Sequence, residues 1–543
     1  MCGILAMIGS APSQLVAKQS KKMSHRGPDE RGIISTSTGH ILSHERLSII
    51  DIHTGKQPIK GDKNTYLIHN GEIYNHLKLK NQLKETHTQR TNSDSEIILH
   101  LYEEQGEECI NLLDGVFAFV ISDQEKVFAG RDPLGVKPLF YGHDQNENLW
   151  FASEVKALID VCTEINEFPP GHYFTQETGF IKYFNPDWMQ GATPNRDGSK
   201  IRETLTNAVK KRLMSDVPLG VLLSGGLDSS LVTSIVTREL KKQNKTVKSF
   251  SVGLSQDSED LLRAREVADF LDTDHHEILF TPEEGIELLK ELIHKVETYD
   301  VTTIRASTPM YIMSKYIREQ GIKVVLSGEG ADEIFGGYLY FGNAPSDEEF
   351  HNECVRRIKR LYTADIQRAD RSTMGAGIEA RVPFLDKEFL QETMLIDPAL
   401  KTIKRNERME KHILRQAFDT KEQPYLPEHI LWRQKEQFSD GVGYSWVDEL
   451  KKYAEAQVSD SLFEKRETLF PHNTPSTKEA FFYRTIYTEH FPHKDCPKLV
   501  KKWVPRWQKD KDPSGRANTT HNESYYDNTK KEEVENIQPP ISL

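Results

Sequence analysis

The sequence predicts an α/β protein with two domains, and three patterns lead to this prediction. Residues 1–190 contain short, largely apolar runs separated by turns, which is typical of an α+β domain with layered sheets and a few helices. Residues 200–508 alternate strand-like and helix-like runs, which favours a parallel α/β sheet. Between them, Pro186–Ser199 is rich in Gly, Pro, Asn and Asp and is predicted to be a linker.

In the first domain, a helix is predicted from Ser95 to Gln105, because Ile97, Ile98, Leu101 and Tyr102 recur at helical spacing. Short runs of apolar residues predict the strands of this domain. These runs are Ile4–Ile8, Tyr66–His69, Val116–Ile121, Val127–Ala129 and Leu149–Ala152.

In the second domain, the alternating pattern predicts strands and helices in turn. The expected strands are Val221–Leu223, Ser249–Leu254 and Lys323–Leu326, and the expected helices are Ser229–Leu240 and Glu259–Leu271. Residues 509–543 are rich in polar residues and poor in apolar ones, so this segment is predicted to be a disordered tail.

Composition narrows the class of protein. The net charge of −12 over 543 residues gives no electrostatic footprint for general nucleic-acid binding. Five widely spaced cysteines without a CxxC pair argue against a disulfide framework and a structural zinc site. No signal peptide is recognisable and no apolar run reaches about 18 residues, so we expect a cytoplasmic protein without a membrane segment.

Cys2 is the first candidate for chemistry, since it follows Met1 directly. If Met1 is removed, one residue carries both a thiol and an α-amine, which titrate at about 8.5 and about 7.7–8.0. This pairing of a nucleophile with a base is the arrangement of N-terminal nucleophile hydrolases. The alternative is a small buried residue at the start of a strand.

A second candidate site is the run Ser224–Ser230, SGGLDSS, between a predicted strand and a predicted helix. Glycines let the backbone approach a ligand, and a helix N-terminus offers N–H groups to an anion. Asp228 is a candidate to hold Mg²⁺ against a polyphosphate. The run is no Walker A loop and resembles the loop of N-type ATP pyrophosphatases; the alternative is an ordinary strand-to-helix turn.

A related run, Ser327–Glu333, follows the predicted strand Lys323–Leu326. Loops that follow neighbouring parallel strands meet at the carboxyl edge of the sheet, where such sheets bind ligands. The acids Asp228, Glu329 and Asp332 would repel a triphosphate unless a cation lies between them. We therefore expect Mg²⁺ here, with Asp228 and Asp332 as its ligands.

These runs belong to a longer series of motifs. The first half contains Met1–Ile4, His25–Asp29, His44–Ile50, Asn70–Asn75 and Ser93–Glu96. The second half contains Ser224–Ser230, Thr302–Ser307, Ser327–Glu333, Glu379–Asp386 and Arg433–Gly441. Their order resembles glutamine-hydrolysing asparagine synthetases from Cys2 to about Trp507, and most closely the bacterial B-type. The resemblance implies an αββα Ntn-hydrolase (class II glutamine amidotransferase) domain in residues 1–190. It implies an ATP-pyrophosphatase (PP-loop) domain in residues 200–508.

The resemblance assigns roles in a glutamine site. Cys2 would be the nucleophile, and Asn70 with Gly71 would form the oxyanion hole. Arg46 would bind the α-carboxylate, and Asp94, with Glu72 or its backbone, would bind the α-ammonium. The remaining glutamine-binding positions implied are Leu47, Ser48, Ile49 and Ile50. His25, His44 and Asn75 are given no catalytic role, and His275–His276 is not interpreted as a metal site.

The resemblance also assigns roles in a synthetase site. The implied ATP-binding positions are Leu223, Ser224, Gly225, Gly226, Asp228, Ser229, Val252, Ser327 and Gly328. Glu329 would take part in forming β-aspartyl-AMP. Arg381 and Lys435 are candidate phosphate partners, and Thr302, Thr303 and Arg305 are candidate aspartate contacts. Packing or surface ion pairing is the alternative for this last group.

The implied reaction is ATP-dependent synthesis of L-asparagine from L-aspartate, with ammonia from L-glutamine, giving AMP, pyrophosphate and glutamate. The substrates are small molecules, and the resemblance implies a homodimer. Sugar-phosphate and phosphoribosyl amidotransferases resemble only the first half, and relatives that close a lactam ring lack the N-terminal cysteine. A scaffold protein with a decayed site would have lost Cys2, Asp228 or Glu329, and all three are present.

Overall fold

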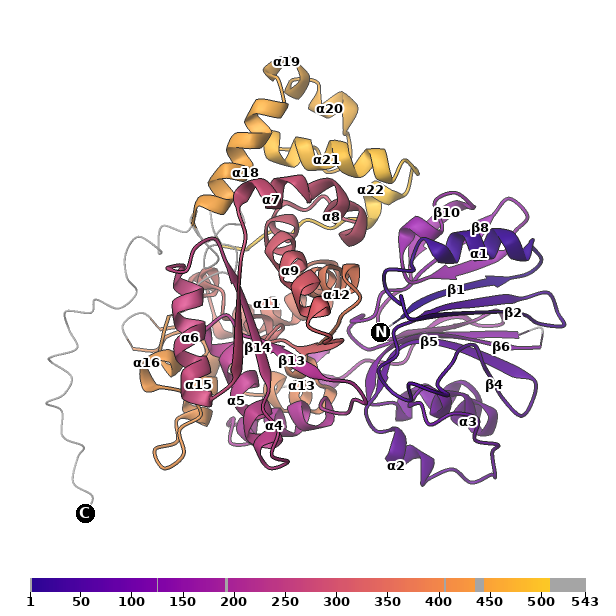
Figure 1. Cartoon of the computed structure of the whole chain (residues 1–543), viewed down its shortest axis with the longest axis horizontal. Coiled ribbons are helices and arrows are strands. Elements are labelled where there is room, and N and C mark those ends of the chain that lie inside the picture. The colour runs from indigo at the N-terminus through magenta and orange to yellow at the C-terminus, as the bar shows by residue number, and fades with distance from the viewer. Residues whose placement is uncertain (1, 125, 191–193, 405–406, 435–443, 508–543) are drawn as a thin grey trace, which may run out of the picture.

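The structure is a computed structural model that describes residues 2–124, 126–190, 194–404, 407–434 and 444–507. Lys435 and the predicted tail, residues 509–543, lie outside the described residues. Figure 1 shows a sheet-rich first domain on the right and a larger mixed domain on the left.

The first domain contains two six-stranded antiparallel sheets. One has the order β10-β8-β9-β1-β3-β2, with β1 Gly3–Ile8, β2 Glu30–Ser35, β3 Ile41–Arg46, β8 Phe140–Asp144, β9 Leu149–Ala152 and β10 Cys162–Glu167. The other has the order β12-β11-β7-β6-β5-β4, with β4 Ile59–Lys60, β5 Thr65–Ile73, β6 Gly115–Asp123, β7 Lys126–Arg131, β11 His172–Thr175 and β12 Gly179–Lys182.

The two sheets pack face to face. Ile4 and Ala6 of β1 share one apolar core with Ile68 of β5 and with Ala118 and Val120 of β6. Helix α1 (Ser13–Lys21) lies over the outer face of the first sheet, and α2 (His76–Lys80) and α3 (Glu96–Gln105) lie beyond the second (Figure 1). The layers are therefore αββα, as the family resemblance implied.

The second domain is built on a five-stranded parallel sheet with the order β15-β14-β13-β16-β17. Its strands are β13 Leu219–Leu222, β14 Lys248–Gly253, β15 Asp274–Leu279, β16 Val324–Leu326 and β17 Glu379–Arg381. Val221 and Leu223 join one core, and Leu222 joins a second. Because successive side chains of a strand point to opposite faces, both faces of the sheet are covered.

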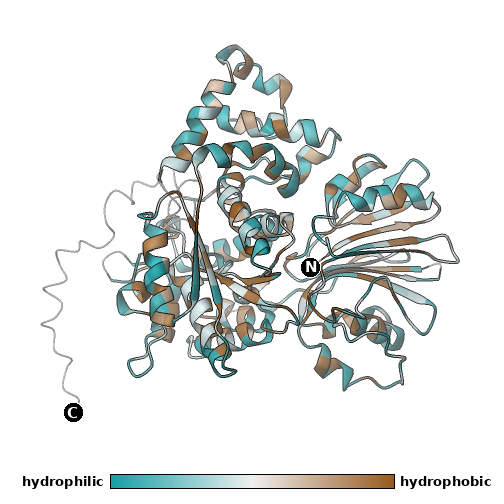
Figure 2. Cartoon of the chain, viewed as in Figure 1, coloured by the Kyte–Doolittle hydropathy of each residue, from teal (hydrophilic) through white to brown (hydrophobic). Residues whose placement is uncertain are grey.

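Helices surround this sheet, and their polar faces point outward (Figure 2). Those next to the sheet or the site are α4 Ile201–Lys211, α5 Leu227–Lys241, α6 Glu259–Leu271, α8 Leu289–Val296, α9 Val301–Glu319, α10 Ala331–Phe335, α12 Asp365–Gly375 and α15 His412–Phe418. The others are α7 Pro282–Glu287, α11 Asp347–Arg360, α13 Lys387–Met394, α14 Pro398–Lys401, α16 Glu428–Leu431, α18 Tyr444–Gln457, α19 Asp460–Phe463, α20 Arg466–Leu469, α21 Lys478–His490 and α22 Cys496–Leu499.

The two domains meet where β1 begins. Arg26 donates to the Cys2 carbonyl at 3.0 Å and pairs with Glu154 at 3.0 Å and with Asp370 of α12 at 2.9 Å. All three side chains of this ion-pair group are buried. A buried ion pair is costly to break from one side only, so this group fixes the domains relative to one another.

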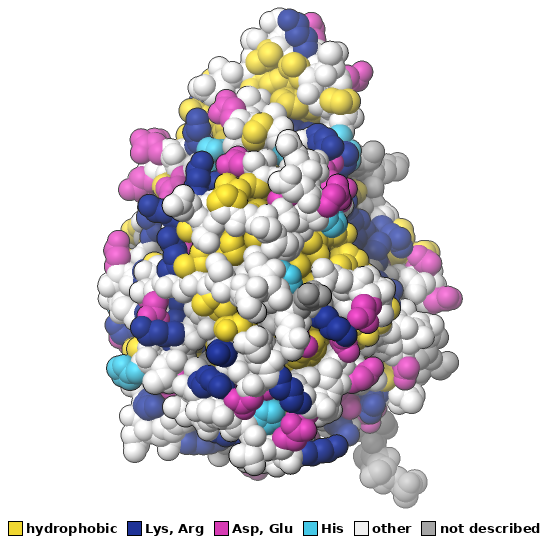
Figure 3. Space-filling model, turned by 90° about the vertical axis from the view of Figure 1, so that its right-hand side faces the viewer, with side chains coloured by type: hydrophobic (Ala, Val, Ile, Leu, Met, Phe, Trp, Pro, Cys, Tyr) yellow, Lys and Arg dark blue, Asp and Glu magenta, His cyan; other side chains and the backbone are white. Residues whose placement is uncertain are grey.

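The surface of the first domain carries charges of both signs. Figure 3 shows basic and acidic side chains interspersed around a band of hydrophobic ones. Within the described ranges, no helix combines the length and the apolar character that a membrane crossing requires.

Candidate functional site

The first site surrounds Cys2, which precedes β1 and is 8% exposed. Its backbone N–H donates to Asn70 Oδ1 at 2.9 Å, and its Sγ lies 4.0 Å from the Leu47 carbonyl oxygen. Burial raises the pKa of the Cys2 thiol. The thiol is therefore neutral at rest, and its use as a nucleophile requires a base beside it.

Asn70 and Gly71 lie side by side on β5. Asn70 Oδ1 is occupied by Cys2, whereas its buried Nδ2 has no hydrogen-bond partner among the residues described. Gly71 has φ +152°, and a Cβ there would lie 2.0 Å from the Val116 carbonyl oxygen, so a side chain is excluded. A buried amide donor without an acceptor fits an oxyanion hole.

Two carboxylates lie near this donor. Asp94 Oδ2 accepts from the Ile73 N–H at 2.7 Å, and Glu72 Oε1 lies 3.2 Å from Arg381 Nη2. Burial, with a contribution from Glu379, raises the pKa of Glu72 well above its ordinary value, and burial raises that of Asp94. Glu72 Oε2 is buried with no hydrogen-bond partner in the described structure. An ammonium group bound between these acids would offset the cost of burying their negative charge, so they are suited to bind one.

Arg46, on β3, contacts the loop that follows it. Its guanidinium pairs with Glu30 at 3.1 Å and donates to the carbonyls of Ile50, Asp51 and Ile52 at 3.4, 2.5 and 3.2 Å. Leu47 and Ile49 are buried against Val324 and Met374 of the second domain. The Ser48 N–H donates to Asp29. The predicted glutamine-binding run 46–50 thus lies along the domain junction.

The residues that received no catalytic role have structural contacts. His25 lies 3.3 Å from Glu154 Oε1, and His44 Nε2 lies 3.1 Å from the His69 carbonyl oxygen. Asn75 donates to the Leu112 carbonyl. His275 on β15 lies within hydrogen-bond distance of Ser249 and Ser251, and His276 stacks on Phe250.

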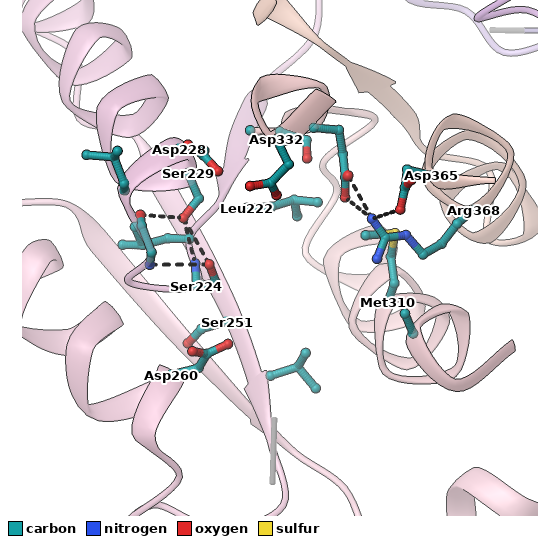
Figure 4. Close-up of a pocket in the computed structure, with 18 of the residues that line it drawn as sticks. Leu222, Ser224, Asp228, Ser229, Ser251, Asp260, Met310, Asp332, Asp365 and Arg368 are labelled. Atoms are coloured by element: carbon teal, nitrogen blue, oxygen red, sulfur yellow. Dashed lines mark hydrogen bonds and ion pairs between the residues drawn. The ribbon is translucent and has the colours of Figure 1, made fainter. Parts of the chain in front are cut away.

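The second site is a cavity of about 170 Å³ at the carboxyl edge of β13, β14 and β16 (Figure 4). Ser224 and Ser229 tie the glycine loop together, with their hydroxyls 3.0 Å apart and the Ser224 N–H 3.2 Å from Ser229 Oγ. A Cβ on Gly328 would lie 2.6 Å from the Ser229 nitrogen. The two glycine-rich loops are therefore in contact, which only glycine permits.

The predicted ATP-binding residues line this cavity with one exception. Gly225 does not line it; it has φ +72°, and a Cβ there would lie 2.5 Å from the Cβ of Arg263 on α6. Its physical role is to let the loop pass α6. The predicted ATP-binding residues that do line it are Leu223, Ser224, Gly226, Asp228, Ser229, Val252, Ser327 and Gly328. Glu329 and Asp332, which were predicted for adenylate formation and for the metal, line it as well.

Cations neutralise the acids of this cavity. Lys411 Nζ lies 2.5 Å from Asp228 Oδ2 and 2.5 Å from Asp332 Oδ1. Arg368 donates to both oxygens of Glu329 at 2.7 Å and lies 3.4 Å from Asp365 (Figure 4). Sequence reasoning missed Lys411, the residue before α15, and Arg368 of α12, because neither lies in a recognisable motif.

The acids are suited to a magnesium ion. Asp228 Oδ1 is buried and accepts no hydrogen bond from any described residue. Carboxylate oxygens of this kind are the ligands that Mg²⁺ prefers. Asp228 and Asp332 both pair with the ammonium group of Lys411, which shows that the two carboxylates together bind a positive charge.

Three predicted contacts are not found at the cavity. Arg381 was expected beside phosphate, but its guanidinium contacts Glu379, Glu72 and the carbonyls of Arg212 and Met214. In β17, Glu379 and Arg381 share the face of the strand opposite to Ala380, and this face is turned to the first domain.

The other two predicted contacts lie on α9. Arg305 forms a two-pronged pair with Glu479 at 2.8 and 2.5 Å, and Thr303 Oγ1 donates to Asp300 at the helix N-cap. Thr302 does line the cavity, and its buried Oγ1 has no hydrogen-bond partner within the described ranges. Lys435 cannot be placed, because it lies outside the described residues.

Fold and sites together define a glutamine-dependent amidotransferase joined to a nucleotide-binding synthetase domain. The family model for the glutamine amidotransferase domain matches residues 1–183, and that for asparagine synthase matches residues 200–348 and 342–512. The chain belongs to the family of glutamine-hydrolysing asparagine synthetases.

Relatives share about half of the residues over nearly the whole chain. Proteins named probable glutamine-hydrolysing asparagine synthetase in Dictyostelium discoideum and in Schizosaccharomyces pombe are each 51% identical. Each of these alignments covers 96% of this chain and 99% of the relative. Glutamine-hydrolysing asparagine synthetase 2 of Oryza sativa is 48% identical, and the alignment covers 100% of this chain and 96% of the rice protein. These eukaryotic relatives lend no support to the bacterial B-type assignment.

Proposed function

We propose that this chain makes L-asparagine from L-aspartate, with ATP as the energy source and L-glutamine as the nitrogen donor. AMP, pyrophosphate and glutamate are the other products. The observation that carries the proposal is that both half-sites are present in one chain of this family. A buried cysteine lies beside a free amide donor, and a glycine-lined cavity lies at the edge of the parallel sheet.

In the first site, Cys2 attacks the side-chain amide of glutamine once Met1 has been removed. Its α-amine then takes the thiol proton, because the buried thiol is otherwise neutral. Asn70 Nδ2 and the Gly71 N–H stabilise the oxyanion. Ammonia leaves, and water releases glutamate from the thioester. Glu72 and Asp94 hold the α-ammonium, and Arg46 holds the α-carboxylate after exchanging a contact with its own loop.

In the second site, the loop Ser224–Ser229 and the pair Ser327–Gly328 hold ATP while the aspartate β-carboxylate attacks the α-phosphorus. The products of this step are β-aspartyl-AMP and pyrophosphate. Mg²⁺, when bound, neutralises phosphate charge, and Asp228 and Asp332 would hold it. Glu329 takes part in adenylate formation, and its pairing with Arg368 fixes its orientation. Thr302 is the aspartate contact that we retain.

Ammonia then attacks β-aspartyl-AMP and displaces AMP. Free ammonia in water is mostly protonated, so a protected route between the sites is required. Strand β17 borders both sites: the Arg381 carbonyl accepts from the Ser327 N–H at 2.9 Å, and its side chain reaches Glu72. We further propose a cytoplasmic location, and a homodimer that rests on the family alone.

Amide-¹⁵N glutamine with aspartate, ATP and Mg²⁺ tests the proposal. We expect ¹⁵N in the asparagine side chain, and AMP and pyrophosphate released in equal amounts. Omission of aspartate is the matched control and should stop AMP release. Label transferred to another acceptor, or AMP formed equally well without aspartate, would refute the assignment.

A further inference from the structure

A cluster of two histidines and several acids lies in the first domain, away from both sites. His87 is in the loop before α3, and His100 and Glu103 are on α3. One ligand atom from each of the three lies within 4.8 Å of the other two. Among the residues that the structure describes, no other group of His, Cys, Asp or Glu is arranged in this way.

The cluster is buried and its hydrogen bonding is incomplete. The side chains of His87, His100 and Glu103 are 5%, 8% and 0% exposed. His100 Nδ1 and Glu103 Oε2 are buried atoms with no hydrogen-bond partner in the part of the chain described. Leaving such atoms unsatisfied is costly, and a bound cation would satisfy both.

The surrounding residues orient His87 as a ligand. Its Nε2 lies 3.2 Å from Glu104 Oε1, which also accepts from the backbone N–H groups of Lys84 and Glu85 at 2.8 Å. When the Nε2–H of His87 donates to Glu104, Nδ1 carries the free lone pair. This nitrogen lies 3.6 Å from Glu103 Oε2 and 3.8 Å from Asp62 Oδ2. A carboxylate behind a histidine in this way is typical of protein zinc sites.

We propose that His87, His100 and Glu103, with Asp62 as a fourth ligand, bind one zinc ion. Two imidazoles with carboxylates suit zinc, whereas calcium and magnesium take oxygen ligands almost exclusively. Zinc bonds of about 2.1 Å place neighbouring ligand atoms roughly 3.4 Å apart, so binding draws these side chains slightly together. The cysteine spacing could not have predicted this site, because it contains no cysteine.

The ion would link three segments: the turn at Asp62, the loop that carries His87, and α3. The same loop continues to Asp94, which precedes α3 and belongs to the glutamine site. Because the ion binds only the folded arrangement, zinc should raise the unfolding temperature of the chain. This effect does not depend on the proposed synthetase activity.

The test is a zinc titration of the full chain by calorimetry, in a Cys2→Ala background that removes the reactive thiol. We expect one ion per chain, and cobalt(II) in its place should give the visible absorption of a tetrahedral nitrogen–oxygen site. H87Q should weaken zinc binding at least tenfold, and E104Q about 10- to 100-fold. His143→Gln is the matched control, and this variant should bind zinc normally. His143 lies on β8 of the first sheet, away from the cluster, and pairs with Glu164.

Two results would overturn the proposal. The first is the absence of stoichiometric zinc binding, which would mean that the two histidines only pair with the acids around them. The second is binding that persists in H87Q while the protein remains folded by circular dichroism. His87 lies in a loop, so H87Q decides the question even if an H100Q variant fails to fold.

Discussion

Arg381 of the second domain pairs with Glu72 of the first, with 3.2 Å between Arg381 Nη2 and Glu72 Oε1. Both side chains are buried. Glu72 lies beside Asn70 and Gly71, so a strand of the parallel sheet supplies the counter-ion of an acid in the proposed glutamine site. The two sites are thus joined through side chains as well as through the linker.

Replacing Arg381 should therefore impair glutamine use. Arg381 lowers the pKa of Glu72, so in R381M that pKa should rise further, which disfavours the charged form that would bind the α-ammonium. We expect a higher KM for glutamine that falls again as the pH is raised and Glu72 ionises. Glutaminase kinetics from pH 6 to 9 measure this. R381K, which keeps the charge, should resemble the parent more closely, and a KM rise in R381M that is independent of pH would contradict the argument.

Cys2→Ala should abolish asparagine synthesis from glutamine and preserve synthesis from added ammonium. The reason is that the thiol acts only in the release of ammonia. Asparagine formation with each nitrogen donor is the measurement. Cys109→Ala, at another buried cysteine of the same domain, is the control and should retain both activities. Equal loss with both donors in Cys2→Ala would disprove this division of labour.

Asn70→Ala should lower the glutaminase kcat by about 10²- to 10³-fold, the usual cost of one oxyanion donor. The ammonia-dependent reaction should be unaffected. Asn75→Ala, at a neighbouring asparagine that donates to the Leu112 carbonyl, is the matched control. A change in KM without a change in kcat would assign Asn70 to substrate binding instead.

Asp228→Ala should remove activity with either nitrogen donor, because both reactions require ATP. It also leaves Lys411 with one acid partner instead of two. Aspartate-dependent pyrophosphate release is the readout. Glu239→Gln, near the C-terminal end of the same helix α5 and paired with Lys242, should be close to normal. Full ammonia-dependent turnover in Asp228→Ala would refute the pyrophosphate-loop assignment.

Acid should destabilise the first domain through His44. Burial lowers the pKa of His44 to about 3, against about 6.5 in the unfolded chain. Between these values the unfolded state binds more protons, so stability falls as pH falls, by up to about 1.4 kcal/mol per pH unit. H44Q should show a shallower loss of urea-unfolding free energy between pH 6.5 and 4. An unchanged slope, or the same flattening in the control His143→Gln, would count against this.

Sequence patterns predicted the elements whose residues are mostly apolar or recur at helical spacing. Helix α6 has the predicted bounds Glu259–Leu271. Strand β16 was predicted to within one residue at each end, and β13 to within two. Strands β15 and β17 were missed, because Asp274–Glu277 and Glu379–Arg381 are polar or charged runs. In β17 the charges are buried only because they pair with each other and with Glu72, which no local pattern reveals.

The site was predictable to the same extent. Glycine-rich loops and the N-terminal cysteine carry their chemistry in contiguous residues, and the cavity contains nearly all of the expected loop positions. Arg381 was predicted to contact phosphate and does not line the cavity. The motif does not indicate to which face of the strand its side chain points. Lys411 and Arg368 become visible only when distant segments are brought together by the fold.

Burial of the Cys2 thiol affects how sensitive the protein is to oxidants. Peroxides and alkylating agents attack thiolates, and a thiol with a raised pKa presents few of them at neutral pH. The remaining cysteines, Cys109, Cys162, Cys354 and Cys496, are buried as well. The nucleophile should thus resist sulfenic acid formation while no substrate is bound, and should become vulnerable only when its proton is withdrawn.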